Sequence, residues 1–106
     1  MLVSTTNEIA GYRVVRHLGV VRGVTVRSRS LVGNFFGGLQ SLLGGKLSIY
    51  VTLAEAAREE AFQHMCEHAQ LGGANAVLAM RYESNEIMAG ITEVLAYGTA
   101  VVVEQV

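Results

Sequence analysis

Small apolar residues recur at helical spacing along one segment of the chain, from residue 52 to residue 71. They share one narrow face of the predicted helix: Ala54, Ala57, Ala61, Met65 and Ala69. Thr52 and Glu55 have the T-x-x-E spacing of a helix start, and the pair Gly72-Gly73 is typical of a helix end. The pattern predicts one helix of about five turns, with an alanine face that permits close packing on a sheet.

The residues on either side of this helix have the pattern of β-strands. Ile9 to Ser30 is rich in Val and contains three glycines, which predicts two strands or one long bent strand with bulges. Leu47 to Val51 is predicted as a short strand or an extended lead-in before the helix. Ala74 to Tyr82 and Met88 to Val103 are predicted as two further strands, with the turn at residues 83–86. The order of elements predicts an α+β fold in two layers, one main helix on a mainly antiparallel sheet.

The segment from residue 31 to residue 46 differs from the rest of the chain. Two glycine pairs enclose a short apolar stretch. Its large apolar side chains recur at helical spacing: Phe35, Phe36, Leu39, Leu42 and Leu43. Loops of this length in a small domain are usually functional, interfacial or disordered. We therefore expect a flexible or interfacial loop that contacts a partner protein or a membrane surface.

The balance of apolar and charged residues predicts self-association. The 106 residues correspond to a single domain, 1–106. Of these residues 51% are hydrophobic and 16% are charged, whereas a typical domain has about 25% charged residues. The charged residues are too few to cover the surface of a small monomer, so we expect a homo-oligomer with closed symmetry.

Other features of the sequence concern its compartment and partners. The longest apolar run, residues 94–103, is far shorter than the roughly 20 residues of a transmembrane helix. The first residues lack the basic start and apolar core of a signal peptide, so we expect a cytoplasmic protein. A net charge of −1 gives no overall attraction to nucleic acid. The single cysteine, Cys66, agrees with a reducing compartment and is more typical of a semi-buried side chain than of a nucleophile.

Candidate ligands for a metal ion lie on the predicted helix. Glu60, His64, Glu67 and His68 fall within about 100° of one another around the helix axis. Two histidines at positions i and i+4 can share a divalent transition-metal ion, and a carboxylate, water or another subunit can complete the coordination. Cys66 projects about 160° away from this cluster. The alternative interpretation is a solvated edge of the helix.

Arg58 is a second candidate, because it falls between Ala54, Phe62 and Met65 on the apolar side of the helix. A guanidinium there needs a partner or must extend along the helix. We expect an ion pair or carbonyl contact with the sheet or a neighbouring subunit, or a contact with an anionic or polar ligand at a subunit seam. The sequence contains no phosphate-binding loop and no recognisable catalytic triad, so we expect a binding protein and no enzyme.

Short motifs are spread over nearly the whole chain: Gly11-Tyr12, LGVVRG (18–23), Gly44-Gly45 before Tyr50, AREEA (57–61), LGGANAV (71–77) and YGTAVVV (97–103). Together they resemble the YbjQ family, a group of uncharacterised bacterial and archaeal proteins that carry a heavy-metal-binding label. The resemblance implies a dodecin-like subunit assembled into a pentameric ring, in which extra strands join neighbouring subunits. The family pattern defines no metal ligands, so the candidates on the helix rest on their spacing.

The sequence therefore predicts a homo-oligomeric, pentameric binding protein that holds a heavy-metal ion or a small polar ligand at its subunit seams. The alternative is a structural or partner-binding ring without metal. In that case the Phe35/Phe36 loop would contact a protein or a peripheral membrane surface.

Overall fold

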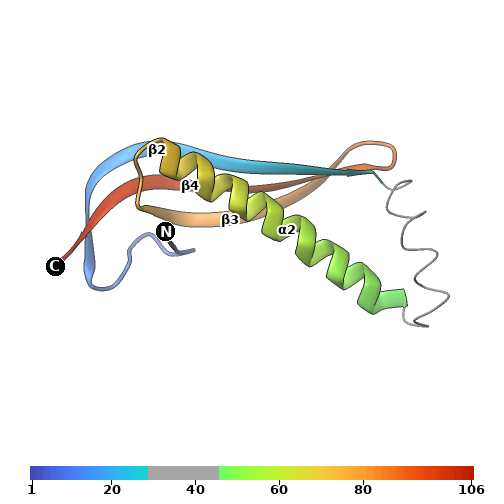
Figure 1. The fold of residues 1–106 in the computed structure, drawn as a ribbon, viewed down its shortest axis with the longest axis horizontal. Coiled ribbons are helices and arrows are strands. Elements are labelled where there is room, and N and C mark those ends of the chain that lie inside the picture. The colour runs from blue at the N-terminus through green and yellow to red at the C-terminus, as the bar shows by residue number, and fades with distance from the viewer. Residues whose placement is uncertain (29–45) are drawn as a thin grey trace.

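The computed structural model describes residues 1–28 and 46–106 of the chain. Within them, one helix lies diagonally across one face of a four-stranded sheet (Figure 1). The elements follow in the order β1 (Leu2–Val3), β2 (Tyr12–Ser28), α2 (Lys46–Leu71), β3 (Ala76–Met88) and β4 (Ile91–Gln105). The predicted α+β architecture, one main helix on a sheet, is confirmed.

The sheet is mixed and mainly antiparallel. Its strand order is β1-β3-β4-β2. β4 pairs antiparallel with β3 on one side and with β2 on the other, whereas β1 pairs parallel with β3 through two residues. β2 is a single long strand with register shifts between Val14 and Arg16 and between His17 and Gly19. Of the two alternatives for this segment, the long strand with bulges is therefore the right one.

The helix begins earlier than predicted. α2 starts at Lys46, so both the helix start at Thr52 and the strand at Leu47–Val51 were wrong. The hydroxyl of Thr52 donates a hydrogen bond to the carbonyl of Ser48, 3.0 Å away and one turn earlier, which is how threonine is accommodated inside a helix. No proline or glycine separates Lys46 from Thr52, and β-branched residues disfavour a helix by only about 0.5 kcal/mol each.

The predicted end of the helix is confirmed. Gly73 has a φ of 92°, which glycine adopts without a steric penalty. The amide of Ala74 then donates to the carbonyl of Ala69 at 2.9 Å. This hydrogen bond closes the last turn of the helix, and the chain continues into β3.

The turn between β3 and β4 lies further along the chain than predicted. β3 continues to Met88, and the turn contains Gly90 with a φ of 76°. The turn at residues 83–86 was wrong, because these polar residues belong to a part of the strand that is exposed to solvent. These residues are polar because the strand is exposed to solvent there, and the chain does not change direction at them.

The predicted alanine face forms the core. Ala57, Ala61, Met65 and Ala69 are buried against the sheet, whereas Ala54 is exposed. The helix comes so close to β2 that a Cβ at position 23 would lie within 3.0 Å of helix backbone atoms. The opposite face of the sheet has a smaller buried cluster: Ala76, Leu78, Val101 and Val103.

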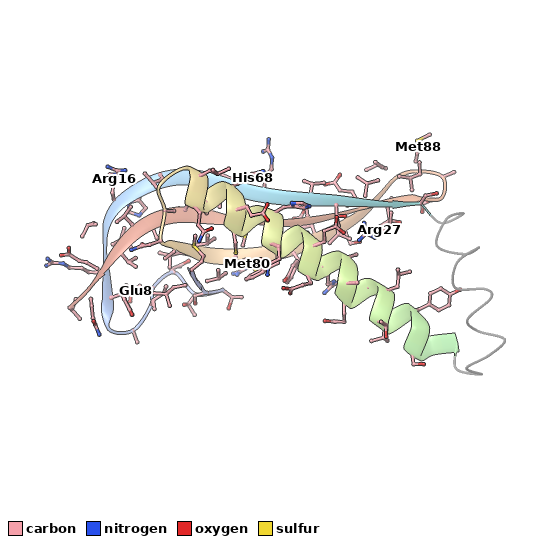
Figure 2. All side chains as sticks on the ribbon, in the orientation of Figure 1. Glu8, Arg16, Arg27, His68, Met80 and Met88 are labelled. Atoms are coloured by element: carbon pink, nitrogen blue, oxygen red, sulfur yellow. The ribbon has the colours of Figure 1, made fainter. Side chains whose placement is uncertain are left out.

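The molecule is elongated, and much of its apolar surface is exposed. The radius of gyration is 17.0 Å, whereas a compact domain of this size has about 12–13 Å. Val20 and Met88 have exposed fractions of 77% and 62%, and Met88 lies at the tip of the hairpin (Figure 2). The outer edge of β2 pairs with no other described strand, and neither does the edge of β3 that faces away from β4, beyond Met80.

Two further expectations concern membranes and partners. No helix within residues 1–28 and 46–106 is long and apolar enough to cross a membrane. The predicted contact residues Phe35, Phe36, Leu39, Leu42 and Leu43 lie outside the described residues, so the interaction loop stays a prediction.

Candidate functional site

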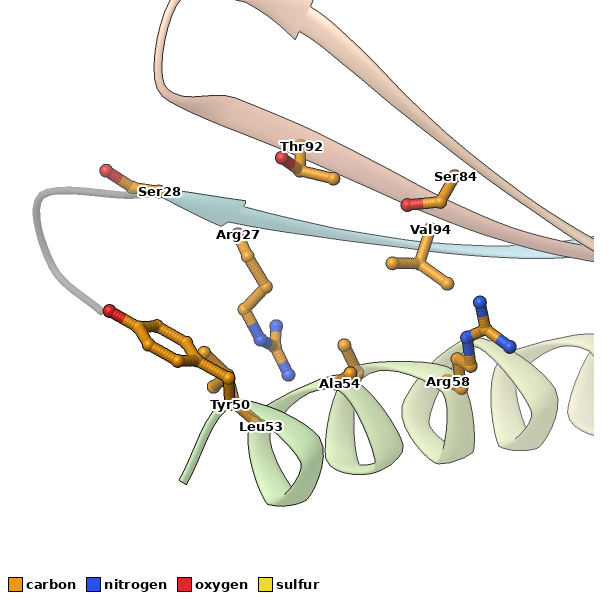
Figure 3. A pocket seen from close by; sticks show the side chains of 10 residues that line it. Arg27, Ser28, Tyr50, Leu53, Ala54, Arg58, Ser84, Thr92 and Val94 are labelled. Carbon is orange, nitrogen blue, oxygen red and sulfur yellow. The ribbon is translucent and has the colours of Figure 1, made fainter. Parts of the chain in front are cut away.

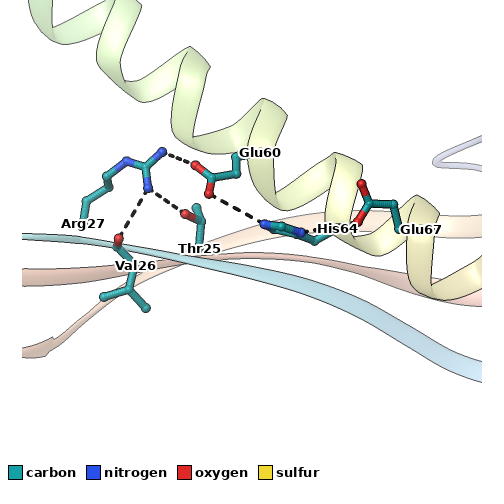
Figure 4. A network of polar contacts seen from close by, with 6 residues as sticks. All are labelled: Thr25, Val26, Arg27, Glu60, His64 and Glu67. Atoms are coloured by element: carbon teal, nitrogen blue, oxygen red, sulfur yellow. Dashed lines mark hydrogen bonds and ion pairs between the residues drawn. The ribbon is translucent and has the colours of Figure 1, made fainter.

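α2 places three of the predicted metal ligands in a row along one side of the helix (Figure 4). The Nε2 atom of His64 lies 3.6 Å from Oε1 of Glu60, and its Nδ1 atom lies 3.7 Å from Oε2 of Glu67. The imidazole is therefore held between two carboxylates, one turn of helix to either side.

Arg27 on β2 extends this row to the sheet. Its guanidinium forms an ion pair with Oε2 of Glu60 and donates a hydrogen bond to the hydroxyl of Thr25 at 2.8 Å (Figure 4). The hydrogen bond from Arg27 is the main cause that lowers the pKa of Glu60 below its usual value. Glu60 is thus a carboxylate at neutral pH, with one oxygen on Arg27 and the other facing His64.

His68, the fourth predicted ligand, contacts the sheet. Its Nδ1 atom lies 2.7 Å from the carbonyl oxygen of Arg22. A carbonyl oxygen only accepts hydrogen bonds, so Nδ1 carries a proton and Nε2 of the neutral ring is left as an acceptor. Metal-bound histidines commonly donate their other ring N–H in this way.

The described residues do not by themselves complete a metal site. No group of three or more His, Cys, Asp or Glu side chains in residues 1–28 and 46–106 is arranged to hold a metal ion. Glu60 and His64 fit as a pair, because two ligands of a tetrahedral zinc ion lie about 3.4 Å apart at bond lengths of about 2.1 Å. A metal on this pair therefore needs further donors from water or from a neighbouring subunit.

Cys66 is separate from this pair. Its side chain is half-buried and packs against the core cluster. Burial raises the pKa of the Cys66 thiol, which lowers the fraction of reactive thiolate. This environment is typical of a structural cysteine.

Arg58 extends from the helix toward β3. Its guanidinium lies over the ring of Tyr82, 5.6 Å from the ring centre, a distance typical of a cation–π contact. None of the ion pairs among the described residues includes Arg58. We expected an ion pair or a carbonyl contact between Arg58 and the sheet. Arg58 contacts the sheet through the ring of Tyr82, a partner that helical spacing alone does not identify.

A cavity of about 300 Å³ lies between the first half of α2 and the sheet, near the β3–β4 hairpin (Figure 3). Its walls are largely apolar, with two guanidinium groups and several hydroxyls. The lining residues are Arg27, Ser28, Tyr50, Leu53, Ala54, Ala57, Arg58, Ser84, Thr92 and Val94. The sequence did not predict this cavity, because Leu47–Val51 was assigned to an extended segment and not to the helix that forms one wall.

The alternation along β2 could have identified Thr25 and Arg27 as partners of the helix. Val21, Gly23 and Thr25 are buried, so every second residue of this stretch faces α2. Arg27 continues that series and meets Glu60.

The fold and this site define a small α+β domain with a charged row between helix and sheet. The chain belongs to the YbjQ family: the family model, described as "Putative heavy-metal-binding", matches residues 1–104. The resemblance noted in the sequence is thereby confirmed.

Relatives cover nearly the whole chain. A UPF0145 protein from Chromobacterium violaceum is 63% identical over 103 residues, which are 97% of this chain and 88% of that protein. UPF0145 proteins from Solibacter usitatus and Burkholderia thailandensis are 54% and 51% identical, over 93% and 94% of this chain and 88% and 90% of their own lengths.

A solved structure shows the same fold. It is a protein of unknown function of the DUF74 family from Pediococcus pentosaceus, with a TM-score of 0.63 and 16% identity. The alignment covers 98% of each chain. At this identity the similarity concerns the fold alone.

Proposed function

We propose that this chain is the subunit of a homo-oligomeric, cytoplasmic binding protein that holds a heavy-metal ion or a small polar ligand at its subunit seams. The observation that carries the metal proposal is the orientation of His64 between Glu60 and Glu67. Glu67 lies 3.7 Å from Nδ1, whereas Nε2 and the Oε1 atom of Glu60, 3.6 Å apart, are the two donors that we assign to a divalent transition metal. We propose a binding role and not a catalytic one for the single domain, 1–106.

The elongated shape supports association. Two sheet edges pair with no other described strand: the outer edge of β2, and the edge of β3 that faces away from β4, beyond Met80. Pairing of one edge with the other edge of a neighbour is a head-to-tail contact, which generates a ring when the rotation closes. The family resemblance points to five subunits. Such a contact would also bring a second subunit close to α2.

A metal ion bound by Glu60 must compete with the positive charge of Arg27. Arg27 already neutralises part of the charge of Glu60, so a cation at this position competes with the guanidinium. The remaining donors come from water, from His68 after a side-chain movement, or from the neighbouring subunit. Nitrogen and oxygen donors of this kind suit zinc, copper or nickel.

Metal titration of the untagged protein tests this proposal. We expect Zn²⁺, Cu²⁺ or Ni²⁺ to bind with a fixed ratio to subunits in isothermal titration calorimetry. His64→Ala should weaken binding by roughly 10-fold or more, and His17→Ala on exposed β2 is the matched control. Equal binding by the His64 variant and the wild type, or no binding to the wild type, would reject the metal site.

The second candidate is a structural or partner-binding ring without metal. It is favoured by the ion pair between Arg27 and Glu60, which satisfies the carboxylate within the chain. In this case the exposed apolar side chains of the hairpin and of β2 contact neighbouring subunits or another protein. An oligomer that binds none of the three metals would support this candidate.

A further inference from the structure

We propose that the cavity between the first half of α2 and the β3–β4 hairpin binds a small organic carboxylate, anchored by Arg58. The cavity of about 300 Å³ is at the lower end of the range for small-molecule sites, and it has the usual mixture of apolar walls and a few polar groups. This site does not use His64, so it stands or falls independently of the metal proposal.

The two arginines that line the cavity are not equivalent. Arg27 forms its ion pair with Glu60 and donates to Thr25. Arg58 takes part in no ion pair among the described residues and lies over the ring of Tyr82. A contact with the face of a ring leaves N–H groups of the guanidinium available for a carboxylate, which it binds with a bidentate geometry. Arg58 is therefore the cation that is available to an anionic ligand.

Neighbouring charges favour a ligand that makes direct contact. Glu55 and Glu59 lie close enough to Tyr82 to raise the pKa of its hydroxyl, although burial is the larger cause. These two carboxylates oppose a general attraction of anions to this region. Affinity must then come from short charge-assisted hydrogen bonds together with apolar contact, and a bare inorganic anion has no apolar part to supply the second.

The sheet side of the cavity provides hydroxyl groups. Ser84 and Thr92 line the cavity from adjacent strands (Figure 3). Neither side chain takes part in a hydrogen bond with another residue of the described chain. Both hydroxyls can therefore donate to a carboxylate oxygen that reaches this side of the cavity.

Apolar side chains make up most of the remaining lining. Leu53 and Ala57 come from the helix and Val94 comes from the sheet. Tyr50 adds an aromatic ring at the end of the cavity (Figure 3). A flat or branched hydrocarbon body attached to one carboxylate matches this combination of guanidinium, hydroxyl and apolar groups.

Benzoate is a suitable probe, with benzyl alcohol and inorganic phosphate as its neutral and its purely anionic counterparts. We expect benzoate to bind the wild-type protein at millimolar concentration or below in ligand-observed NMR, and both counterparts to bind more weakly. Arg58→Met should weaken benzoate binding by roughly 10-fold or more. Arg16→Met makes the same charge change on β2 outside the cavity and should leave benzoate binding unchanged.

A second variant keeps the proposal testable if the methionine variant is poorly folded. Ala54→Trp places a large side chain at an exposed lining position and should block benzoate. Absence of benzoate binding by the wild type, or equal binding by the Arg58 and Arg16 variants, would overturn the proposal. His64→Ala should not affect benzoate, so that failure of this site and failure of the metal site are distinguishable.

Discussion

A methyl group at position 23 should separate the helix from the sheet. In Gly23→Ala the new Cβ would lie within 3.0 Å of backbone atoms of Ala61, His64 and Met65, where ordinary contact is 3.4–4 Å. The obstructing atoms are backbone, so no side-chain rotation can relieve the overlap. To restore an ordinary contact, α2 must move away by about 1 Å or more, and even a gap of about 0.5–1 Å removes a quarter to a half of the attraction between facing atoms.

The loss of stability in Gly23→Ala depends on which residues of α2 are displaced. Ala61 and Met65 are both fully buried, so the displacement affects the centre of the core. We expect a loss of about 3 kcal/mol in the free energy of unfolding, at the upper end of the usual range for overpacking. With a urea slope of about 1.5 kcal/mol/M, the unfolding midpoint should fall by about 2 M.

Gly72→Ala is the matched control. A Cβ there would meet only two carbonyl oxygens at 3.6 Å, so its stability should stay within about 0.5 kcal/mol of the wild type. Urea unfolding followed by circular dichroism measures both variants, at one protein concentration because association contributes to stability. If Gly23→Ala unfolds at the same urea concentration as Gly72→Ala, the close approach of helix and sheet is refuted.

Three further predictions use the same unfolding assay. Thr52→Ala should change stability by less than about 0.5 kcal/mol, whereas a loss of about 1 kcal/mol would indicate the helix start that the structure contradicts. Asn75→Ala should cost about 2 kcal/mol, because the amide exchanges two hydrogen bonds with the backbone of Val103 at 2.8 and 2.9 Å; an unchanged midpoint would contradict this. Glu60→Gln should cost up to about 1 kcal/mol at pH 7, and a difference that does not shrink as the pH falls below the ordinary glutamate range would argue against the ion pair as its cause.

The sign of the last effect follows from the pKa of Glu60. Its pKa in the folded chain is below the ordinary value of 4.5, chiefly because of the hydrogen bond from Arg27. The stabilisation is therefore fully present above that ordinary value and is lost as the pH falls through the folded pKa. Glutamine does not titrate, so the two proteins should converge in acid.

The sequence identified the features of the fold that depend on the spacing of residues along the chain. The alanine face of α2 was predicted because a helix brings every third or fourth residue to the same side. The end of the helix was predicted because glycine at position 73 permits a backbone conformation that other residues avoid. Both signals are local, so no tertiary information was needed.

The errors have a common origin in polar residues that have two roles. Thr52 can cap a helix or donate to a carbonyl within it, and the spacing to Glu55 does not distinguish these roles. The polar residues 83–86 occur in turns and equally on a strand exposed on both faces. Tertiary packing decides in each case, and a single sequence does not report it.

The candidate site was predicted in part. Helical spacing brought Glu60, His64 and Glu67 together, and the structure places them side by side. The ion pair with Arg27 and the contact of His68 with the backbone of β2 depend on the register between helix and strand. That register is set by the close approach at position 23, which helical periodicity alone does not specify.

Association is the central claim, because it would account for the exposed apolar side chains and provide the remaining donors at the seams. Native mass spectrometry of the untagged protein at micromolar concentration measures the number of subunits and any bound mass together. We expect a single closed oligomer, a pentamer, that retains a metal ion or a small ligand in a fixed ratio to subunits. A stable monomer without bound mass would contradict both the ring and every site proposed at its seams.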